Sequence, residues 1–412
     1  MSDETDPRPE RISEAEHAVM EALWDKSPLS AADVCDAVCE DRGWSMPTVK
    51  TLLGRLVGKG AIDTTPDGRR FLYTPVIARA DYVGSESKRL VTRLFGGRAA
   101  PLIAHLAENE ALTEEDLTEI EALLTLASVL KAKQQGGTPH RLLQGKTLGL
   151  LFQKPSTRTR VSFEAGMNQL GGHALVLPMA DIQLSRGESV ADTARVLSRY
   201  LDGIVIRTYD HATVEEWARE ATMPVINGLT DLSHPCQALS DLLTIKEKKG
   251  TLKGIKIAYV GDGNNVANSL IEAAAKMGIN IALGCPSGYQ PDQHVVDVAR
   301  VEAVKTGATI DVGQDPYVAV KEADVVYADV WISMGREREQ ARRLKVLSPY
   351  QVNSRLVAKA KPDAIVMHPG PMNRGVEIDS AVADGPWSVI LDQVANGVAV
   401  RMAVLYLLAG EE

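Results

Sequence analysis

A run of hydroxyl and guanidinium side chains near the middle of the chain has the chemistry of an anion-binding site. Ser156, Thr157, Arg158, Thr159 and Arg160 stand between a predicted strand and a predicted helix. Backbone N–H groups at a helix start, together with hydroxyls and a guanidinium fork, bind phosphate well. The alternative is a helix cap with two surface arginines. The density of hydroxyls and arginines at one strand-to-helix turn favours the anion site.

Three further polar clusters also follow predicted strands. Arg207 ends one strand, His234–Gln237 precedes a helix, and Asp329–Gly335 follows another strand. Because open α/β sheets bind ligands beyond the carboxyl ends of their strands, these clusters are expected to share one site. A lone histidine is more often structural, so His234 gains weight only from its neighbours. Gly261–Asn265 suggests a dinucleotide loop, but it lacks the third glycine of GxGxxG and we reject that interpretation.

The elements that must position these clusters are short apolar strands alternating with helical stretches. The predicted strands are Leu148–Phe152, Ala174–Leu177, Gly203–Arg207, Ile255–Val260, Ile281–Gly284, Val325–Ala328 and Ala364–Met367. The helices next to the site are predicted over Val161–Leu170 and from near Ala238. This alternation is typical of parallel sheets with crossover helices, and about 275 residues suffice for two doubly wound α/β lobes.

The pattern before Gln134–Pro139, where Gly and Pro end a helix, is different. Three amphipathic helices are followed by two short apolar runs around a tight turn, which predicts a winged helix. The helices are Glu14–Leu23, Ala31–Cys39 and Pro47–Val57, with Ser13 and Ser30 as N-caps, and the hairpin is Ala61–Ile62, the turn Pro66–Gly68, and Phe71–Tyr73.

One face of the third helix is basic and polar. Thr48, Lys50, Thr51 and Arg55 have the short polar and cationic side chains that reach base edges and phosphates in a major groove. Arg69 and Arg70, at the hairpin tip, are placed to contact flanking phosphates. A solvated basic face on an ordinary three-helix domain explains the same spacing, and spacing alone leaves both interpretations open.

Overall composition indicates a globular chain and hides this basic region. The 412 residues are 45% hydrophobic with a formal net charge of −9, yet residues 42–100 hold eleven Lys and Arg against four acids, a net charge of +7. No uninterrupted apolar run approaches the roughly 20 residues that span a bilayer, and the acidic start does not resemble a signal peptide. Four cysteines indicate a cytoplasmic protein without a disulfide scaffold. Cys35 and Cys39 lie four apart without a nearby histidine pair, which favours small buried hydrophobes over metal ligands.

The N-terminal motifs resemble a known family of repressors. GWSMPTVKTLLGRLVGKGAI and GRRFLYTP are similar to the BlaI/MecI penicillinase-repressor family, over about residues 10–125. The resemblance implies a winged-helix DNA-binding domain over residues 1–78 and a helical dimerisation segment over residues 79–125. It also implies a dimer on a palindromic operator in double-stranded DNA. The family's proteolytic cleavage site has no match here.

The motifs of the larger region resemble the ornithine carbamoyltransferase family. They are STRTRVSFE, RGESVADTARVLSRY, IRTY, HPCQALSDLLTI, GDGNNVANS and DVWISMG, from about Leu112 to Met367. The resemblance implies a carbamoyl-phosphate lobe over residues 112–265 and an amino-acid lobe over residues 250–412. The two ranges overlap, and the boundary between the lobes is placed near residue 250. It further implies a catalytic trimer with sites at the subunit interfaces.

The resemblance also assigns roles to individual residues. Carbamoyl phosphate and its carbamoyl group would be bound by Ser156, Thr157, Arg158, Thr159, Arg207, His234 and Gln237, with Thr159, Arg207 and His234 polarising the carbamoyl oxygen. Gln183 or Arg186 would reach into a neighbouring subunit's site. L-ornithine would be bound by Asn265, Asp329, Ser333 and Met334. No metal and no organic cofactor is implied.

The C-terminal tail departs from that family. Where ornithine enzymes carry His-Cys-Leu-Pro, this chain has His368-Pro369-Gly370-Pro371, and Gly397 stands in place of the arginine of their Glu-Asn-Arg motif. From residue 368 the tail resembles the aspartate carbamoyltransferase family, in which the carbonyls of Pro369 and Gly370 would hold the carbamoyl amide.

Three functional hypotheses remain. The acidic DVWISMG motif favours ornithine over aspartate as acceptor, while the tail and the missing cysteine keep aspartate carbamoylation, or reduced activity, as alternatives. The third hypothesis is a repressor whose transferase half only senses metabolites. Two-fold pairing of heads and three-fold assembly of bodies together predict a homo-oligomer as large as a hexamer.

Overall fold

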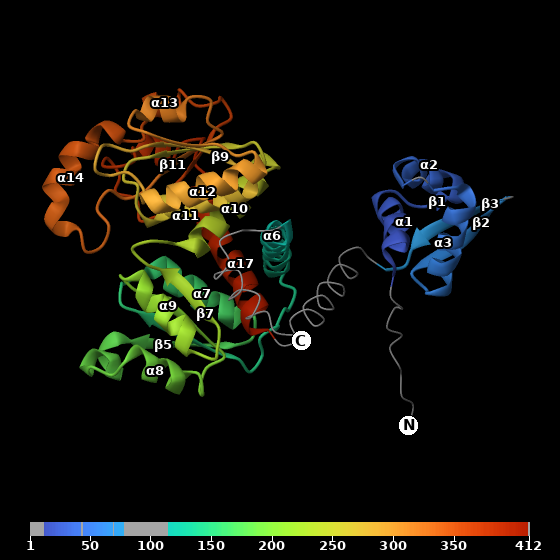
Figure 1. Cartoon of the computed structure of the whole chain (residues 1–412), viewed down its shortest axis with the longest axis horizontal. Coiled ribbons are helices and arrows are strands. Elements are labelled where there is room, and N and C mark those ends of the chain that lie inside the picture. Colours follow the sequence, from blue (N-terminus) through green and yellow to red (C-terminus); the bar gives the residue numbers. More distant parts are fainter. Residues whose placement is uncertain (1–11, 43, 69, 78–113, 411–412) are drawn as a thin grey trace. The chain divides into compact units, whose positions relative to one another are not determined.

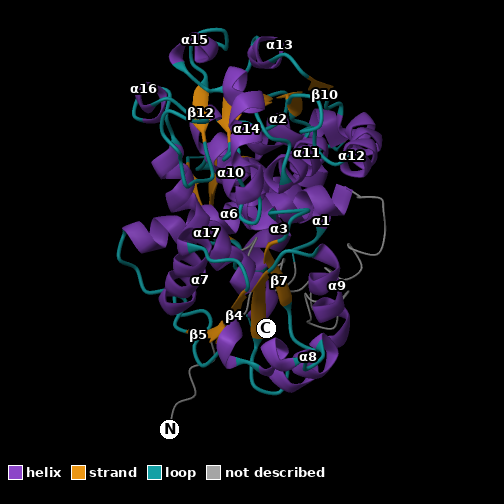
Figure 2. Cartoon of the chain, turned by 90° about the vertical axis from the view of Figure 1, so that its left-hand side faces the viewer, coloured by secondary structure: helices purple, strands orange, loops and turns teal. Residues whose placement is uncertain are grey.

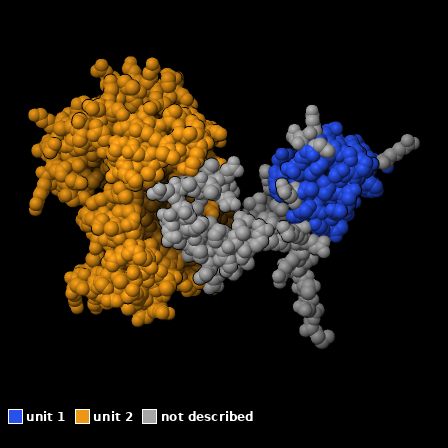
Figure 3. Space-filling view, in the orientation of Figure 1, with its two compact units in different colours: residues 1–98, 412 blue, residues 99–411 orange. Residues whose placement is uncertain are grey.

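The computed structural model describes residues 12–77, apart from 43 and 69, and residues 114–410. The chain divides into two compact units, residues 1–98 with 412 and residues 99–411 (Figure 3). Each unit has its own hydrophobic core. Arg69 and most of the predicted dimerisation segment 79–125 lie outside the described residues.

The N-terminal unit is a winged helix, as predicted. Its three-stranded antiparallel sheet has the order β1-β3-β2, and β2 and β3 form the hairpin. The predicted turn at Pro66–Gly68 is displaced, because the strand continues through Asp67, which pairs with Arg70. The elements are α1 (Glu14–Asp25), β1 (Leu29–Ser30), α2 (Ala31–Arg42), α3 (Met46–Gly58), β2 (Ile62–Asp67) and β3 (Arg70–Pro75) (Figure 1).

Side-chain caps fix the starts of the first two helices. Ser13 Oγ accepts from Glu16 N at 3.3 Å, and Glu16 Oε2 accepts from Ser13 N at 2.6 Å, which is a complete capping box. Ser30 Oγ accepts from Asp33 N at 3.3 Å at the start of α2. Both predicted N-caps are therefore confirmed.

The prediction that Cys35 and Cys39 are separate buried hydrophobes is wrong. The two side chains are half-buried and joined by a disulfide within α2. Residues four apart on a helix share one face, and their Cα atoms are 5.0 Å apart, within the range that a disulfide bridges.

The first lobe of the larger unit is built on a four-stranded parallel sheet of order β5-β4-β6-β7. Helices α7 to α10 connect and follow its strands. The elements are β4 (Thr147–Phe152), α7 (Thr157–Gln169), β5 (His173–Pro178), η1 (Met179–Asp181), η2 (Gln183–Arg186), α8 (Val190–Leu197), β6 (Gly203–Arg207), α9 (His211–Glu220), β7 (Val225–Leu229) and α10 (Pro235–Lys249) (Figure 2).

The second lobe is built on a five-stranded parallel sheet of order β10-β9-β8-β11-β12. Its elements are β8 (Lys256–Val260), α11 (Asn265–Met277), β9 (Asn280–Gly284), α12 (Gln293–Thr306), β10 (Ile310–Gly313), α13 (Pro316–Val320), β11 (Val325–Ala328), η3 (Glu337–Glu339), α14 (Gln340–Leu347), η4 (Ser348–Tyr350), α15 (Ser354–Val357), β12 (Ile365–Met367) and α16 (Ser380–Ala383). The predicted pair of parallel α/β lobes is confirmed.

All seven predicted strands occur in this unit, and two further strands were not predicted. The sequence of β7, VINGL, contains Asn and Gly, which are depleted in strands. The four-residue edge strand β10 alternates buried and accessible side chains, so it lacks an apolar run. Both strands are recognisable only through their partners in the sheet.

Two long helices join the lobes into one core. α6 (Glu114–Gln135) packs along α17 (Ile390–Ala409), and α17 also contacts α7 and α10 (Figure 1). Leu124, Phe163, Leu243, Leu270 and Met402 belong to one buried cluster that spans both lobes. Among the described helices, α17 has the length and apolar composition to cross a membrane, but most of it is buried here, as in the central helix of a globular core.

We predict that Ser13→Ala weakens α1 by about 1 kcal/mol, because the first-turn amide loses its acceptor. Hydrogen exchange of the α1 amides, measured by mass spectrometry on the full chain, should accelerate about fivefold. Ser45→Ala is the matched control, since Ser45 caps α3 without a side-chain cap bond. If Ser45→Ala accelerated exchange in α3 as much as Ser13→Ala accelerates exchange in α1, the prediction would be contradicted.

Candidate active site

The phosphate end of the site is the start of α7, directly beyond strand β4. The helix begins at Thr157, earlier than predicted, because Ser156 Oγ caps it by accepting from Thr159 N at 3.2 Å. Thr157, Arg158 and Thr159 therefore occupy the first turn, where backbone N–H groups are free of helical partners. Arg160 differs: it is exposed and pairs with Glu164 at 3.6 Å. Of the two arginines in this turn, Arg158 lines the site and Arg160 does not.

A second group of cations lies at the end of strand β6 and the start of α10. Arg207 is buried, and its Nη1 donates to Thr159 Oγ1 at 3.3 Å. Burial, together with the charges of Arg158 and Arg401, lowers the pKa of Arg207 to about 10. The pKa of His234 is held well below its ordinary value by burial and then by Arg207, Arg401 and Arg158. At neutral pH the imidazole is therefore uncharged beside three charged guanidinium groups.

Helix α10 starts at Pro235 instead of near Ala238, because proline suits the first helical position. This start places Gln237 in the first turn, with its Nε2 donating to Asp241 Oδ1 at 2.9 Å. Since the amide nitrogen is engaged, its carbonyl oxygen is left to accept from a ligand. The backbone N–H of His234 donates to Ser269 Oγ at 2.8 Å, which ties the start of α10 to α11 of the other lobe.

Asp241 is the centre of a buried hydrogen-bond network. Its carboxylate also accepts from Gln393 Nε2 at 2.8 Å and from Tyr327 Oη at 2.8 Å. Gln393 Oε1 in turn accepts from His368 N at 2.9 Å. Burial raises the pKa of Asp241 to about 7 against the lowering effect of these donors. The network holds Gln237 in register with strand β11 and with the segment after β12.

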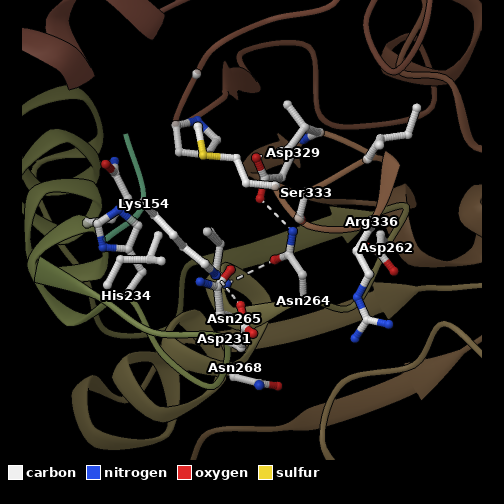
Figure 4. Close-up of a pocket in the computed structure, with 18 of the residues that line it drawn as sticks. Lys154, Asp231, His234, Asp262, Asn264, Asn265, Asn268, Asp329, Ser333 and Arg336 are labelled. Carbon is white, nitrogen blue, oxygen red and sulfur yellow. Dashed lines mark hydrogen bonds and ion pairs between the residues drawn. The ribbon is translucent and has the colours of Figure 1, made fainter. Parts of the chain in front are cut away.

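The amino-acid end of the site belongs to the second lobe. Asp329, just beyond β11, is buried, and its Oδ2 accepts from Asn264 Nδ2 at 2.7 Å (Figure 4). Burial raises the pKa of Asp329, opposed by His368 and the Asn264 hydrogen bond. Asn265 reaches the first lobe and donates to Thr230 O at 2.5 Å. Ser333 and Met334 follow on the same loop and also line the cavity.

The tail segment closes the site between the two ends. Pro369 and Gly370 line the cavity, and Gly370 N donates to His368 Nδ1 at 2.9 Å. Gly370 has a φ of +72°, and a Cβ there would lie 3.1 Å from Arg158 Nε. Only glycine therefore allows this backbone to approach the phosphate-site arginine so closely.

A single cavity of about 730 Å³ gathers the predicted residues. Its lining includes Ser156, Thr157, Arg158, Thr159, Arg207, His234, Gln237, Asn265, Asp329, Ser333, Met334, Pro369 and Gly370. Gln183 and Arg186 do not line it; both are exposed on η2. Their predicted role in a neighbouring subunit's site stays a prediction. The described residues contain no cluster of three or more His, Cys, Asp or Glu that would hold a metal.

Several lining residues were not predicted from the sequence. Lys154 is buried, forms an ion pair with Asp231, and has its Nζ 4.3 Å from the ring centroid of Tyr209 (Figure 4). Lys154 follows β4 directly, so the strand-end rule could have found it. Arg343 pairs with Asp262 at 2.7 Å, and burial raises the pKa of Asp262 to about 6. No local signal marks Arg343, which reaches the site only through the position of α14.

Comparisons with known proteins agree with this geometry. Residues 105–247 match the carbamoyl-P binding domain of the aspartate/ornithine carbamoyltransferase family, and residues 253–408 match its Asp/Orn binding domain. Residues 12–126 match the penicillinase repressor family.

Individual relatives are similar over most of their length. An anabolic ornithine carbamoyltransferase of Pyrococcus furiosus is 53% identical over 311 residues, which is 75% of this chain and 99% of that protein. The ornithine carbamoyltransferase of Bacillus subtilis is 52% identical over 296 residues, 72% of this chain and 92% of that protein. The solved Pyrococcus furiosus structure superimposes with a TM-score of 0.69 at 54% identity, covering 71% of this chain and 94% of that chain.

The two parallel-sheet lobes and the two family models that match them show that the chain is of the aspartate/ornithine carbamoyltransferase class. Within that class, the chain belongs to the ornithine carbamoyltransferase family and is a transferase. It carries an additional N-terminal winged-helix unit of the penicillinase-repressor type.

We predict that Asp241→Asn changes how stability depends on pH. Between about pH 4 and pH 7 the unfolded wild type loses the Asp241 proton while the folded state keeps it, so its free energy of unfolding falls as pH rises. The fall is at most about 1.4 kcal/mol per pH unit, and it ends above the folded pKa. The variant lacks this loss. The melting temperature of the variant minus that of the wild type should therefore increase from about pH 5 to about pH 7.5.

Asp384→Asn is the control for this measurement. Arg374 lowers the pKa of the exposed Asp384, so its removal cannot reproduce a loss of wild-type stability with rising pH. A pH-independent difference between Asp241→Asn and the wild type would contradict the raised pKa.

Proposed function

We propose that the protein transfers the carbamoyl group of carbamoyl phosphate to the δ-amino group of L-ornithine, giving L-citrulline and phosphate. The observation that carries the proposal is a single cavity with the cationic start of α7 at one end and the buried carboxylate of Asp329 at the other. An anionic donor and a cationic acceptor are thereby held on opposite sides. The names of the relatives support the same reaction and a place in arginine biosynthesis.

The residues of the α7 end would bind and activate the donor. The N–H groups of Thr157 and Arg158, in the first turn of α7, and the Arg158 guanidinium hold the phosphate. Thr159, Arg207 and the neutral His234 donate to the carbamoyl oxygen, where negative charge develops as the amine attacks. Each such donor is worth typically a few kcal/mol of transition-state stabilisation. The Gln237 carbonyl accepts from the carbamoyl NH₂ group.

The transfer balances without a cofactor. The neutral δ-amine forms a bond to the carbamoyl carbon, the oxyanion collapses, and the bond from that carbon to the phosphate oxygen breaks. Phosphate leaves into a pocket already lined by guanidinium groups and carries away the proton that the attacking nitrogen releases.

The second lobe favours ornithine over aspartate as the acceptor. The carboxylate of Asp329 complements an α-ammonium group, and its ionised form is favoured once that cation binds. Arg343 is engaged by the buried Asp262 and Arg336 by Glu339 at 3.1 Å. The pair of Arg336 is exposed, so Arg336 is the cation that can turn to meet the α-carboxylate. A second carboxylate, as aspartate has, would lie beside the buried carboxylate of Asp329, and the lining guanidinium groups of Arg158 and Arg207 belong to the end proposed to bind the phosphate.

We predict citrulline formation with ornithine and no carbamoyl-aspartate formation with aspartate when the two acceptors are assayed side by side. Asp329→Asn should lower kcat/KM for ornithine about 10- to 100-fold, because one charge-assisted hydrogen bond is lost. Asp384→Asn, which alters an exposed ion pair with Arg374, should leave kcat/KM unchanged. Turnover of aspartate in place of ornithine would overturn the proposal.

We also propose that the winged helix binds double-stranded DNA. Helix α3 buries Val49, Leu52, Leu53 and Leu56 and exposes Thr48, Lys50, Thr51 and Arg55 on the opposite face. Arg70 is exposed at the hairpin tip, where it pairs with Asp67 at 2.7 Å. The penicillinase-repressor match supports this reading of the exposed face. The hypothesis that the transferase half only senses metabolites has less support, since its site residues are complete at the phosphate end.

The DNA proposal predicts salt-dependent binding of the full chain to duplex DNA. Fluorescence anisotropy at two salt concentrations should show weaker binding at the higher one, because phosphate contacts release counterions. Lys50→Glu combined with Arg55→Glu should weaken binding at least about tenfold, whereas Lys26→Glu, outside α3, should change it little. Binding that is indifferent to salt and to the α3 charges would exclude this surface.

The oligomeric state and location stay predictions. A trimer of transferase bodies follows from the family resemblance, a hexamer bridged by paired winged helices follows from combining the two symmetries, and a cytoplasmic location was inferred from the cysteine content.

A further inference from the structure

Helix α17 carries a buried arginine that the reaction described above does not use. Arg401 is only 4% exposed, and its guanidinium lies 5.4 Å from the ring centroid of Phe163. Nη1 donates to Gly397 O at 2.8 Å, while Nε has no partner. No carboxylate of the described residues forms an ion pair with it. Because a buried cation without a counter-charge is costly, the unsatisfied Nε of Arg401 indicates an acceptor supplied by a ligand.

The position of this guanidinium depends on a glycine one helical turn earlier. A Cβ at Gly397 would lie 2.5 Å from Arg401 Nη1, so any other residue there would displace it. Glycine inside a helix costs about 1 kcal/mol relative to alanine, and here it has a packing reason. The absence of a side chain at position 397 opens the space that the Arg401 guanidinium occupies from the next turn.

Arg401 borders the phosphate end of the site. A second cavity, of about 220 Å³, is lined by Arg401 and Gly397 and shares Thr157, Arg158, Gln237 and Pro369 with the main cavity. The charge of Arg401 acts on the site already, because after burial it is among the causes that lower the pKa values of Arg207 and His234. The guanidinium therefore lies in the smaller cavity, which adjoins the place where the carbamoyl group is expected.

We propose that Arg401 is a further binding residue for carbamoyl phosphate, donating to an oxygen of the bound molecule. This inference rests on the proposed carbamoyl transfer. It makes the tail a source of a third guanidinium, beside Arg158 and Arg207, and it assigns Gly397 the role of making room. The bound ligand would supply the acceptor that Arg401 Nε lacks within the protein.

The test compares Arg401→Gln with the relocated double variant Gly397→Arg/Arg401→Gln. The single variant should raise KM for carbamoyl phosphate about tenfold or more and weaken the binding of inorganic phosphate, measured by calorimetry, while KM for ornithine changes little. The double variant, with its arginine one turn earlier, should recover most of the loss. Arg195→Gln, which removes an exposed arginine paired with Glu220, is the matched control.

A pH profile tests whether the Arg401 charge acts on the site, while KM for carbamoyl phosphate and phosphate affinity test binding. Loss of the Arg401 charge should shift the acidic limb that reports His234 to higher pH, because a neighbouring cation no longer opposes protonation. Melting temperatures monitor folding. If Arg401→Gln does not fold, Arg401→Lys, which keeps the charge but loses the forked donors, should still raise KM for carbamoyl phosphate.

The outcomes distinguish this inference from the function on which it rests. Citrulline production by the wild type, with KM for carbamoyl phosphate and phosphate affinity unchanged in the folded variant, would overturn the role of Arg401. Absence of citrulline from the wild type, with phosphate binding that still depends on Arg401, would overturn the proposed reaction and leave the anion-binding role intact.

Discussion

The feature on which the site depends is buried positive charge that the protein does not neutralise. Arg158, Arg207 and Arg401 approach one another around the start of α7, and each lowers the pKa of a neighbour or has its own lowered by burial. Lys154, a few residues away, shows the contrast, because Asp231 neutralises it. A folded chain holds such a repulsive cluster only where packing elsewhere over-determines the positions, and here the core shared by both lobes does so. The proposed anionic donor would bring the missing counter-charge, so the repulsion among these guanidinium groups would itself favour its binding.

The lobes are coupled by hydrogen bonds that pass through the reacting groups' supports. His234 is fixed to Ser269 across the lobe boundary, and Gln237 is fixed to strand β11 and the tail through Asp241. A substrate that orders Gln237 therefore also acts on the elements that present the acceptor-binding loop. The network is fully buried, where hydrogen bonds are strong and an unpaired member is costly. It joins the tail to the rest of the unit: Gln393 of the tail donates to the same carboxylate as Gln237 of the first lobe.

The sequence predicts the parts of this arrangement that depend on local pattern. Buried strands appear as apolar runs, and the rule that ligands bind beyond strand ends selects Arg207, His234 and Asp329, which line one cavity. It fails where tertiary contacts decide. Strand β10 is stabilised by its neighbour β9, the start of α7 is set by the Ser156 cap, and Arg343 and Arg401 reach the site from helices distant in the chain. The disulfide of Cys35 and Cys39 was not predicted, because the low cysteine content was taken to indicate a reducing compartment. The four-residue spacing on a helix nevertheless brings the two side chains together.

The joint between the two halves follows from which face of α6 is buried. Residues 105–126 are matched both by the penicillinase-repressor family and by the carbamoyl-P binding domain, so the two matches overlap in this segment. In this chain Leu124, Ala127 and Leu130 of α6 are buried in the core shared with α17, and Lys131 bonds Glu247 and Asn396. An apolar helix face can be buried against only one partner at a time. The transferase body has taken the shared helix, and any pairing of the winged-helix units has to use residues other than this buried face.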